Sequence, residues 1–141
     1  MTFGFCLYIH QKQDCCLTDY KFFCFHGQPK IMYISKDKAE YPTTDFFDME
    51  YRHLNLKMQD PNSRTLPSKP KNFELMKALA AKMSKGFPHV RVDFFDVNDR
   101  IYMGEMTFYH CSGFAPIQPM EWNLKLGELI KLNLTNTENF S

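Results

Sequence analysis

Two runs of alternating apolar and polar residues stand out in the second half of the chain. In the first run, positions 90, 92 and 94 are apolar, and Arg91 and Asp93 lie between them. In the second run, residues 101–109, Glu105 and Thr107 alternate with apolar positions. A period of two places successive side chains on opposite faces of a β-strand. The pattern therefore predicts two strands, each with one apolar face and one polar face.

The polar segment 98–100 between these runs predicts a hairpin, and the length of its turn sets which residues are paired. With a three-residue turn, Asp93 faces Glu105 across the two strands. In the same register Arg91 faces Thr107, and the apolar positions 90, 92, 106 and 108 share one face. A two-residue turn would place Asp93 opposite Gly104 and would mix the two faces. The apolar pattern therefore favours the three-residue turn.

The remainder of the chain gives shorter strand and helix signals. We expect an edge strand within residues 1–10, a hairpin of residues 20–25 and 30–35 joined through 26–29, and a weaker strand region in 46–56. Residues 57–71 contain three prolines and predict a loop. A helix is expected from the N-cap Asn72 to about residue 85, and a second helix from Pro119. The predicted fold is α+β, an antiparallel sheet of hairpins with the helices packed on one side.

Composition narrows the class of protein. The 141 residues predict a single domain over 1–141, with a polar tail from 133 to 141. A formal net charge of +1 gives no indication of nucleic acid or of an anionic membrane surface as a partner. Five cysteines without a C-x-x-C pair favour a reducing, cytoplasmic location over a disulfide framework. No stretch approaches the ~20 apolar residues of a membrane span.

The opposed carboxylates of Asp93 and Glu105 are the first candidates for chemistry. Directly opposed residues of an antiparallel pair have Cβ atoms roughly 5 Å apart, and like charges at that spacing repel each other. A magnesium ion between the carboxylates would relieve this repulsion, because Mg²⁺ prefers hard oxygen ligands. The alternative is that both are solvated charges on the open face of a sheet, which is common for carboxylates.

Several short segments also occur in a characteristic order. RVDF at 91–94 is followed by GEMT at 104–107 and GF at 113–114, together with DYKFFCFHG at 19–27, KPKN at 69–72 and the segment up to Glu121-Trp122. In this order they resemble the metal-binding end of ATP-grasp enzymes, and most closely the TupA-like ATP-grasp family of bacterial surface-polysaccharide loci. The resemblance covers about residues 18–132 and corresponds to the C-terminal portion of an ATP-grasp protein.

The resemblance implies a role for each polar residue of these strands. Asp93 and Glu105 would hold Mg²⁺, which bridges the phosphates of ATP. Arg91 would steady an acyl-phosphate or a tetrahedral oxyanion, and Lys21 would reach the nucleotide phosphates. Thr107 stands where many ATP-grasp enzymes have a metal-binding Asn, and its hydroxyl is a weaker ligand. Two alternatives stay open: Arg91 as an ion-pair partner of Asp93, and Lys21 as a solvated strand lysine.

Two functions of different classes follow from the resemblance. The first is ATP- and Mg²⁺-dependent ligation, or a glycosyltransferase-associated step, on a carboxylate or sugar-polymer substrate during polysaccharide or teichuronopeptide-type synthesis. Nothing before Asp19 resembles the glycine-rich flap or the hinge of an ATP-grasp N-terminal half. We therefore expect activity to require such a half or a second copy. The second function is a non-catalytic half-domain remnant that acts as a metal-binding or partner-pairing module.

Overall fold

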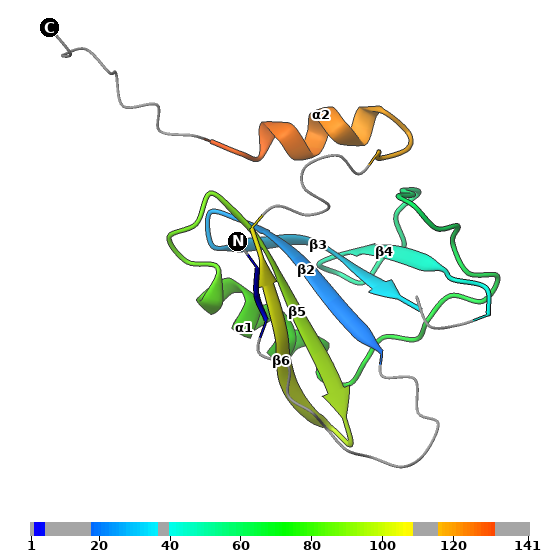
Figure 1. The fold of residues 1–141 in the computed structure, drawn as a ribbon, viewed down its shortest axis with the longest axis horizontal. Coiled ribbons are helices and arrows are strands. Elements are labelled where there is room, and N and C mark those ends of the chain that lie inside the picture. The colour runs from blue at the N-terminus through cyan, green and yellow to red at the C-terminus, as the bar shows by residue number, and fades with distance from the viewer. Residues whose placement is uncertain (1, 5–17, 37–39, 109–115, 132–141) are drawn as a thin grey trace, which may run out of the picture.

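The fold is built on an antiparallel sheet. The computed structural model describes residues 2–4, 18–36, 40–108 and 116–131, and within these residues it contains a six-stranded sheet in the order β1-β6-β5-β2-β3-β4 (Figure 1). The strands are β1 (Thr2–Gly4), β2 (Asp19–Phe25), β3 (Gln28–Ser35), β4 (Thr44–Asp48), β5 (His89–Val97) and β6 (Arg100–Thr107). The helices are α1 (Phe73–Met83) and α2 (Glu121–Glu128). The expected α+β class and antiparallel sheet of hairpins are confirmed.

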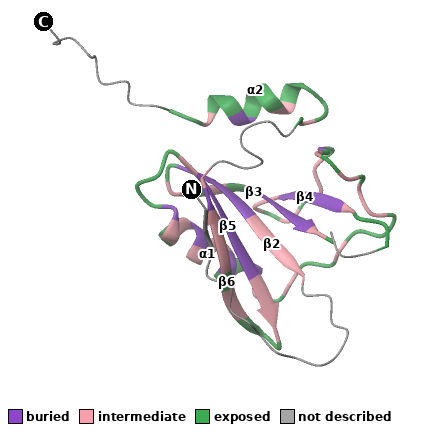
Figure 2. Cartoon of the chain, in the orientation of Figure 1, coloured by how far each residue is buried: buried purple, intermediate pink, exposed green. Residues whose placement is uncertain are grey.

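One face of the sheet packs against α1. Alternate residues of β2, β3 and β5 are buried there together with Phe73, Met76 and Ala80 of the helix. Met106 and Phe108 of the second alternating run also pack against this core, as the apolar pattern predicts. The helix presents its apolar stripe to the sheet because residues three and four apart share one helical face. Figure 2 shows buried residues along β2, β3 and β5, whereas most of β6 is of intermediate exposure.

The opposite face carries a second, smaller core beneath α2. Phe23, Tyr33 and Phe46 are buried there, and Leu126 of α2 packs against the same cluster. The expectation that both helices pack on one side is therefore wrong for α2. The physical reason lies in the strands, where consecutive aromatic residues such as Phe22 and Phe23 place a buried ring on each face. A sheet with apolar residues on both faces needs cover on both.

The β5–β6 hairpin has the expected pairing but a different turn. Arg91 pairs with Thr107 and Asp93 with Glu105, as predicted. The turn, however, contains two residues, 98 and 99, with φ of 54° and 60°, which is typical of a type I′ turn. A β-bulge at Asp93/Phe94 makes up the difference, because Gly104 is an extra residue between Met103, opposite Phe94, and Glu105. The predicted three-residue turn is thus wrong. The predicted register between Asp93 and Glu105 is nevertheless observed, because the extra residue lies in the bulge and not in the turn.

Two other segments border the α2 side of the sheet. The chain between β4 and α1 exchanges two backbone hydrogen bonds with the segment before α2, from Lys57 N to Gln118 O (2.8 Å) and from Gln118 N to Lys57 O (2.9 Å).

In the described part of the chain, no helix has the length and apolar character needed to cross a membrane. The motif at 113–114 and the tail 133–141 lie outside the described residues.

Candidate functional site

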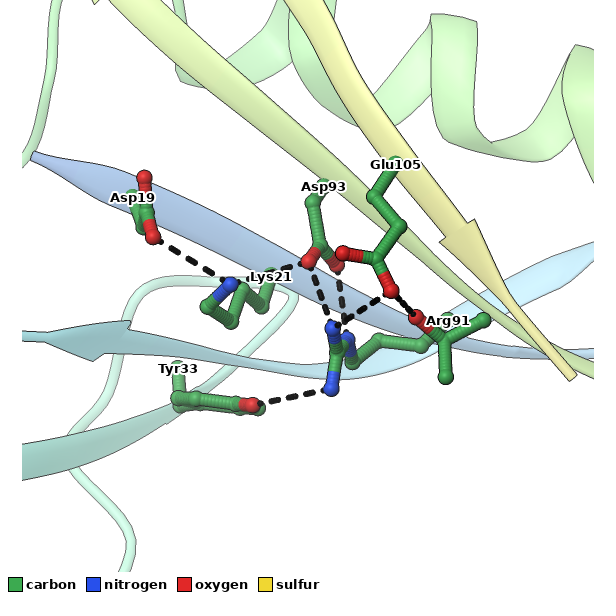
Figure 3. Close-up of polar contacts among 7 residues, drawn as sticks. Asp19, Lys21, Tyr33, Arg91, Asp93 and Glu105 are labelled. Atoms are coloured by element: carbon green, nitrogen blue, oxygen red, sulfur yellow. Dashed lines mark hydrogen bonds and ion pairs between the residues drawn. The ribbon is translucent and has the colours of Figure 1, made fainter. Parts of the chain in front are cut away.

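Four polar side chains form a row across the sheet, at right angles to the strands. Lys21 of β2 is paired with Tyr33 of β3 on one side and with Asp93 of β5 on the other. Asp93 is in turn paired with Glu105 of β6. Figure 3 shows these side chains on one face, with Arg91 beside them. The row exists because residues in register on neighbouring strands point to the same side of the sheet.

Asp93 is the centre of this group. Its side chain is only 3% exposed, and its two oxygen atoms accept three short contacts. Arg91 forms a bidentate pair with it, from Nε to Oδ1 (2.8 Å) and from Nη2 to Oδ2 (2.7 Å). Lys21 Nζ lies 2.9 Å from the same Oδ2. A buried carboxylate is stable only when it is paired in this way.

The second carboxylate of the expected metal pair is more accessible. The Glu105 side chain is 34% exposed, and its Oε1 lies 3.7 Å from Arg91 Nη2. Thr107, two residues later on the same strand, donates its hydroxyl hydrogen bond to this Oε1. The guanidinium of Arg91 therefore lies between the two carboxylates, within ion-pair range of both.

Among the described residues, Asp19 and Tyr33 also belong to this group, although neither was assigned a role from the sequence. Asp19 Oδ2 lies 3.3 Å from Lys21 Nζ, and the Tyr33 hydroxyl lies 3.4 Å from Arg91 Nη1. The signal for Asp19 was present, because residues i and i+2 of a strand share a face. The sequence contains no such signal for Tyr33. Its place beside Lys21 depends on the register between β2 and β3, which the expected four-residue connection does not determine.

The surroundings of Arg91 favour its charged form. Burial alone lowers the pKa of Arg91, but the hydrogen bonds to Asp93 and the electrostatic interactions with Tyr33, Asp93 and Glu105 raise it above its ordinary value. Within the described part of the chain, two cations and three carboxylates give the group a formal charge of +2 − 3 = −1. The face can therefore present cations to an oxyanion or carboxylate oxygens to a metal ion.

The fit to Mg²⁺ differs between the two carboxylates. Both are hard oxygen ligands on one face, as the metal requires. Among the described residues, however, no group of three or more His, Cys, Asp or Glu residues could hold a metal ion. The Asp93 oxygens are engaged by cations, whereas Glu105 is partly exposed. The donor types thus suit Mg²⁺, but the cation that lies between these carboxylates is the guanidinium of Arg91.

Comparison with known proteins adds one finding. A model of the family described as TupA-like ATPgrasp matches residues 7–131, which is most of the chain. No curated protein and no solved structure matches the chain in the corresponding comparisons. The matched range contains every strand of the polar row, from β2 to β6. The chain therefore belongs to the TupA-like ATP-grasp family.

Proposed function

We propose that the polar row binds ATP together with Mg²⁺ and serves an ATP-dependent ligase or a glycosyltransferase-associated step in the synthesis of a bacterial surface polysaccharide. The observation that carries this proposal is the convergence of Lys21, Arg91, Asp93 and Glu105 on one face from three strands. Membership of an ATP-grasp family supports ATP and Mg²⁺ as the ligands. The substrate would be a carboxylate or a sugar polymer, and supply of ATP would place the reaction in the cytoplasm.

Each of the five predicted site residues has a distinct part in the proposal. Lys21 would act as a point charge on the nucleotide phosphates, and Arg91 would bind the oxyanion that forms when a carboxylate is activated. Glu105, Asp93 and the weaker ligand Thr107 would hold Mg²⁺. When bound, the metal supplies charge neutralisation of the phosphates. The chain's own contribution is to orient cations and carboxylates at fixed spacing before the ligand arrives.

We propose further that Mg²⁺ and the nucleotide enter together. Two cations already neutralise Asp93, and Arg91 lies between the carboxylates. A free metal ion would therefore be repelled by Lys21 and Arg91. The phosphates of ATP are an alternative partner for both cations, because they present several oxygens to a guanidinium fork. Their arrival would free carboxylate oxygens for the metal.

A second candidate function follows from the same contacts. Both oxygens of Asp93 are satisfied by neighbouring cations, as in an ion-pair network that serves the fold alone. The domain would then be a non-catalytic remnant that acts as a metal-binding or partner-pairing module. The two functions differ in one property, since only the first requires the row to bind nucleotide.

An NMR titration with a non-hydrolysable ATP analogue, with and without Mg²⁺, separates the two functions. We expect the amides of Lys21, Arg91 and Glu105 to shift, and the affinity to depend on Mg²⁺. Lys21→Gln and Glu105→Gln should each weaken binding about 10- to 100-fold, because each removes a charge-assisted contact. The matched controls Lys82→Gln and Glu74→Gln change exposed residues of α1, on the opposite face, and should bind as the wild type does.

The remnant hypothesis predicts a different pattern. The analogue would then shift no amide of the row, or Lys21→Gln would bind it as well as the wild type does. Either result would overturn the proposed nucleotide site. Far-ultraviolet circular dichroism of each variant checks that the sheet is intact.

A further inference from the structure

Tyr33 contacts the site from two strands away. It lies on β3, in register with Lys21 of β2, and is 6% exposed. Its hydroxyl oxygen lies 3.4 Å from Nη1 of Arg91, which reaches it from β5 past the intervening strand (Figure 3). The contact is therefore made on the side of the guanidinium that faces away from Glu105's strand β6.

The position of this hydroxyl is set by packing of the ring. The Tyr33 ring lies 5.6 Å from the ring of Phe23 and 5.0 Å from that of Phe46, measured between centroids. Both neighbours are themselves buried. A tyrosine has few rotatable bonds, so a packed ring leaves its hydroxyl with little freedom. Tyr33 thus presents an acceptor at a fixed point.

Arg91 is consequently held through three of its nitrogen atoms. Asp93 accepts hydrogen bonds from Nε and Nη2, and Tyr33 accepts one from Nη1. Asp93 also binds Lys21, so its orientation reflects both cations. Contact at a third nitrogen, from a separate strand, restricts the tilt of the planar guanidinium relative to the sheet. Such restriction matters because the strength with which a guanidinium binds an oxyanion depends on the orientation of its planar fork.

We propose that Tyr33 is a positioning residue, which orients the Arg91 guanidinium for an incoming oxyanion such as a phosphate or an acyl-phosphate. The part of this proposal that concerns the ligand rests on the proposed function. Tyr33 itself need not touch the ligand. Its effect passes through Arg91, so the orientation of Arg91 can be tested without any nucleotide.

The first test measures the Arg91 side chain directly. The Nε–Hε cross-peak of Arg91, assigned by its loss in Arg91→Lys, is followed in wild type, in Tyr33→Phe and in the control Tyr41→Phe, a residue that is 77% exposed. We expect the Arg91 Hε to exchange with water several-fold faster in Tyr33→Phe and to be unchanged in the control. Tyr33→Phe keeps the packed ring, so the fold should persist, as thermal unfolding would verify. An unchanged exchange rate in Tyr33→Phe would overturn the proposal.

The second test asks whether Tyr33 acts through Arg91. Affinity for the ATP analogue with Mg²⁺ should fall about three- to tenfold in Tyr33→Phe, as expected for loss of one hydrogen bond. In the Arg91→Lys background the same substitution should cause no further loss, because the oriented group is gone. An equal loss in both backgrounds would show that Tyr33 acts independently of Arg91, contrary to the proposal. If the wild type binds no nucleotide, the proposed function fails, and the exchange measurement still decides the role of Tyr33.

Discussion

At the scale of single residues, the main feature of the site is the Arg91 guanidinium, which lies between the carboxylates of Asp93 and Glu105. Arg91 is 2.7 Å from Asp93 and 3.7 Å from Glu105 through the same nitrogen, Nη2. It therefore relieves the repulsion that opposed carboxylates would otherwise suffer. The sequence suggested a metal ion for this task, and either cation satisfies the same electrostatic requirement. We therefore expect Arg91 and Mg²⁺ to compete for one position in the absence of other anions.

This competition predicts the response of the chain to Mg²⁺ alone. The wild type should show little change in melting temperature, whereas Arg91→Gln should be stabilised by Mg²⁺, because the two carboxylates are left without the guanidinium. A ligand at ten times its Kd stabilises by about 1.4 kcal/mol, which differential scanning fluorimetry detects. The melting temperature of each variant is compared with and without Mg²⁺ at equal ionic strength. The destabilisation caused by losing Arg91 is then present in both measurements and cancels.

The double variant Arg91→Gln/Glu105→Gln is the matched control for this prediction. It removes one of the two opposed charges, and the gain in Mg²⁺ response should disappear. A wild type that responds to Mg²⁺ as strongly as Arg91→Gln does would show that Arg91 does not hold the position of the metal.

At the scale of elements, the β5–β6 hairpin shows what an alternating pattern can and cannot predict. The pattern identified the pairing of Asp93 with Glu105, because the apolar positions on both sides had to reach one core. It did not reveal the two-residue turn. A bulge adds one residue without disturbing the alternation on either side of it, so turn and bulge compensate each other. The one sequence signal for the position of the bulge is Gly104, because a glycine inside a strand pattern is typical of a bulge.

The bulge predicts a specific intolerance at Gly104. A Cβ atom there would lie 2.7 Å from the ring of Phe95, closer than side chains approach. Gly104→Ala should therefore destabilise the fold by about 1–3 kcal/mol, as overpacking does. Urea unfolding measures this change. Gly127→Ala is the matched control, since nothing lies within 4 Å of a Cβ at that helical position and the substitution should be neutral or stabilising.

Relief of the contact provides the converse experiment. If the clash with Phe95 is the cause, Phe95→Ala in the Gly104→Ala background should recover part of the loss. A Gly104→Ala chain as stable as the wild type would mean that the bulge does not depend on glycine.

The candidate site was accessible to sequence reasoning only in part. The five residues Lys21, Arg91, Asp93, Glu105 and Thr107 lie together as the two strands and the family resemblance suggested. Their contacts were not accessible, because β2 meets β5 across a sequence separation of 72 residues between Lys21 and Asp93. No turn sets that register, and it is decided by burial of aromatic residues on both faces of the sheet.

At the scale of the whole molecule, the described site occupies a single face of one sheet. A ligand bound at this face would be contacted from that side only by Lys21, Arg91, Asp93 and Glu105 (Figure 3). Phosphoryl transfer requires electrostatic contacts from several sides and exclusion of water from the reacting groups. We propose that an ATP-grasp N-terminal half, or a second copy of this chain, contacts the ligand from the opposite side and completes the binding site.

This arrangement predicts that the purified 141-residue chain consumes ATP no faster than background. A coupled assay for ADP, run with and without Mg²⁺, measures the rate, and Asp93→Asn serves as the control for a contaminating enzyme. Addition of a matching N-terminal half should strengthen nucleotide binding. Magnesium-dependent ATP consumption by the chain alone, lost in Asp93→Asn, would show that the site needs no contact from the opposite side or that two copies complete each other.

The row across the strands also has a consequence for the order of folding. Lys21 and Asp93 are 72 residues apart, and their contact closes a long loop. Closing long loops is entropically costly, and non-local strand pairing is slow to form. The hairpins β2–β3 and β5–β6 are local and need no such closure. We therefore expect each hairpin to form early with part of the row, and the complete polar group to assemble only when the two hairpins dock.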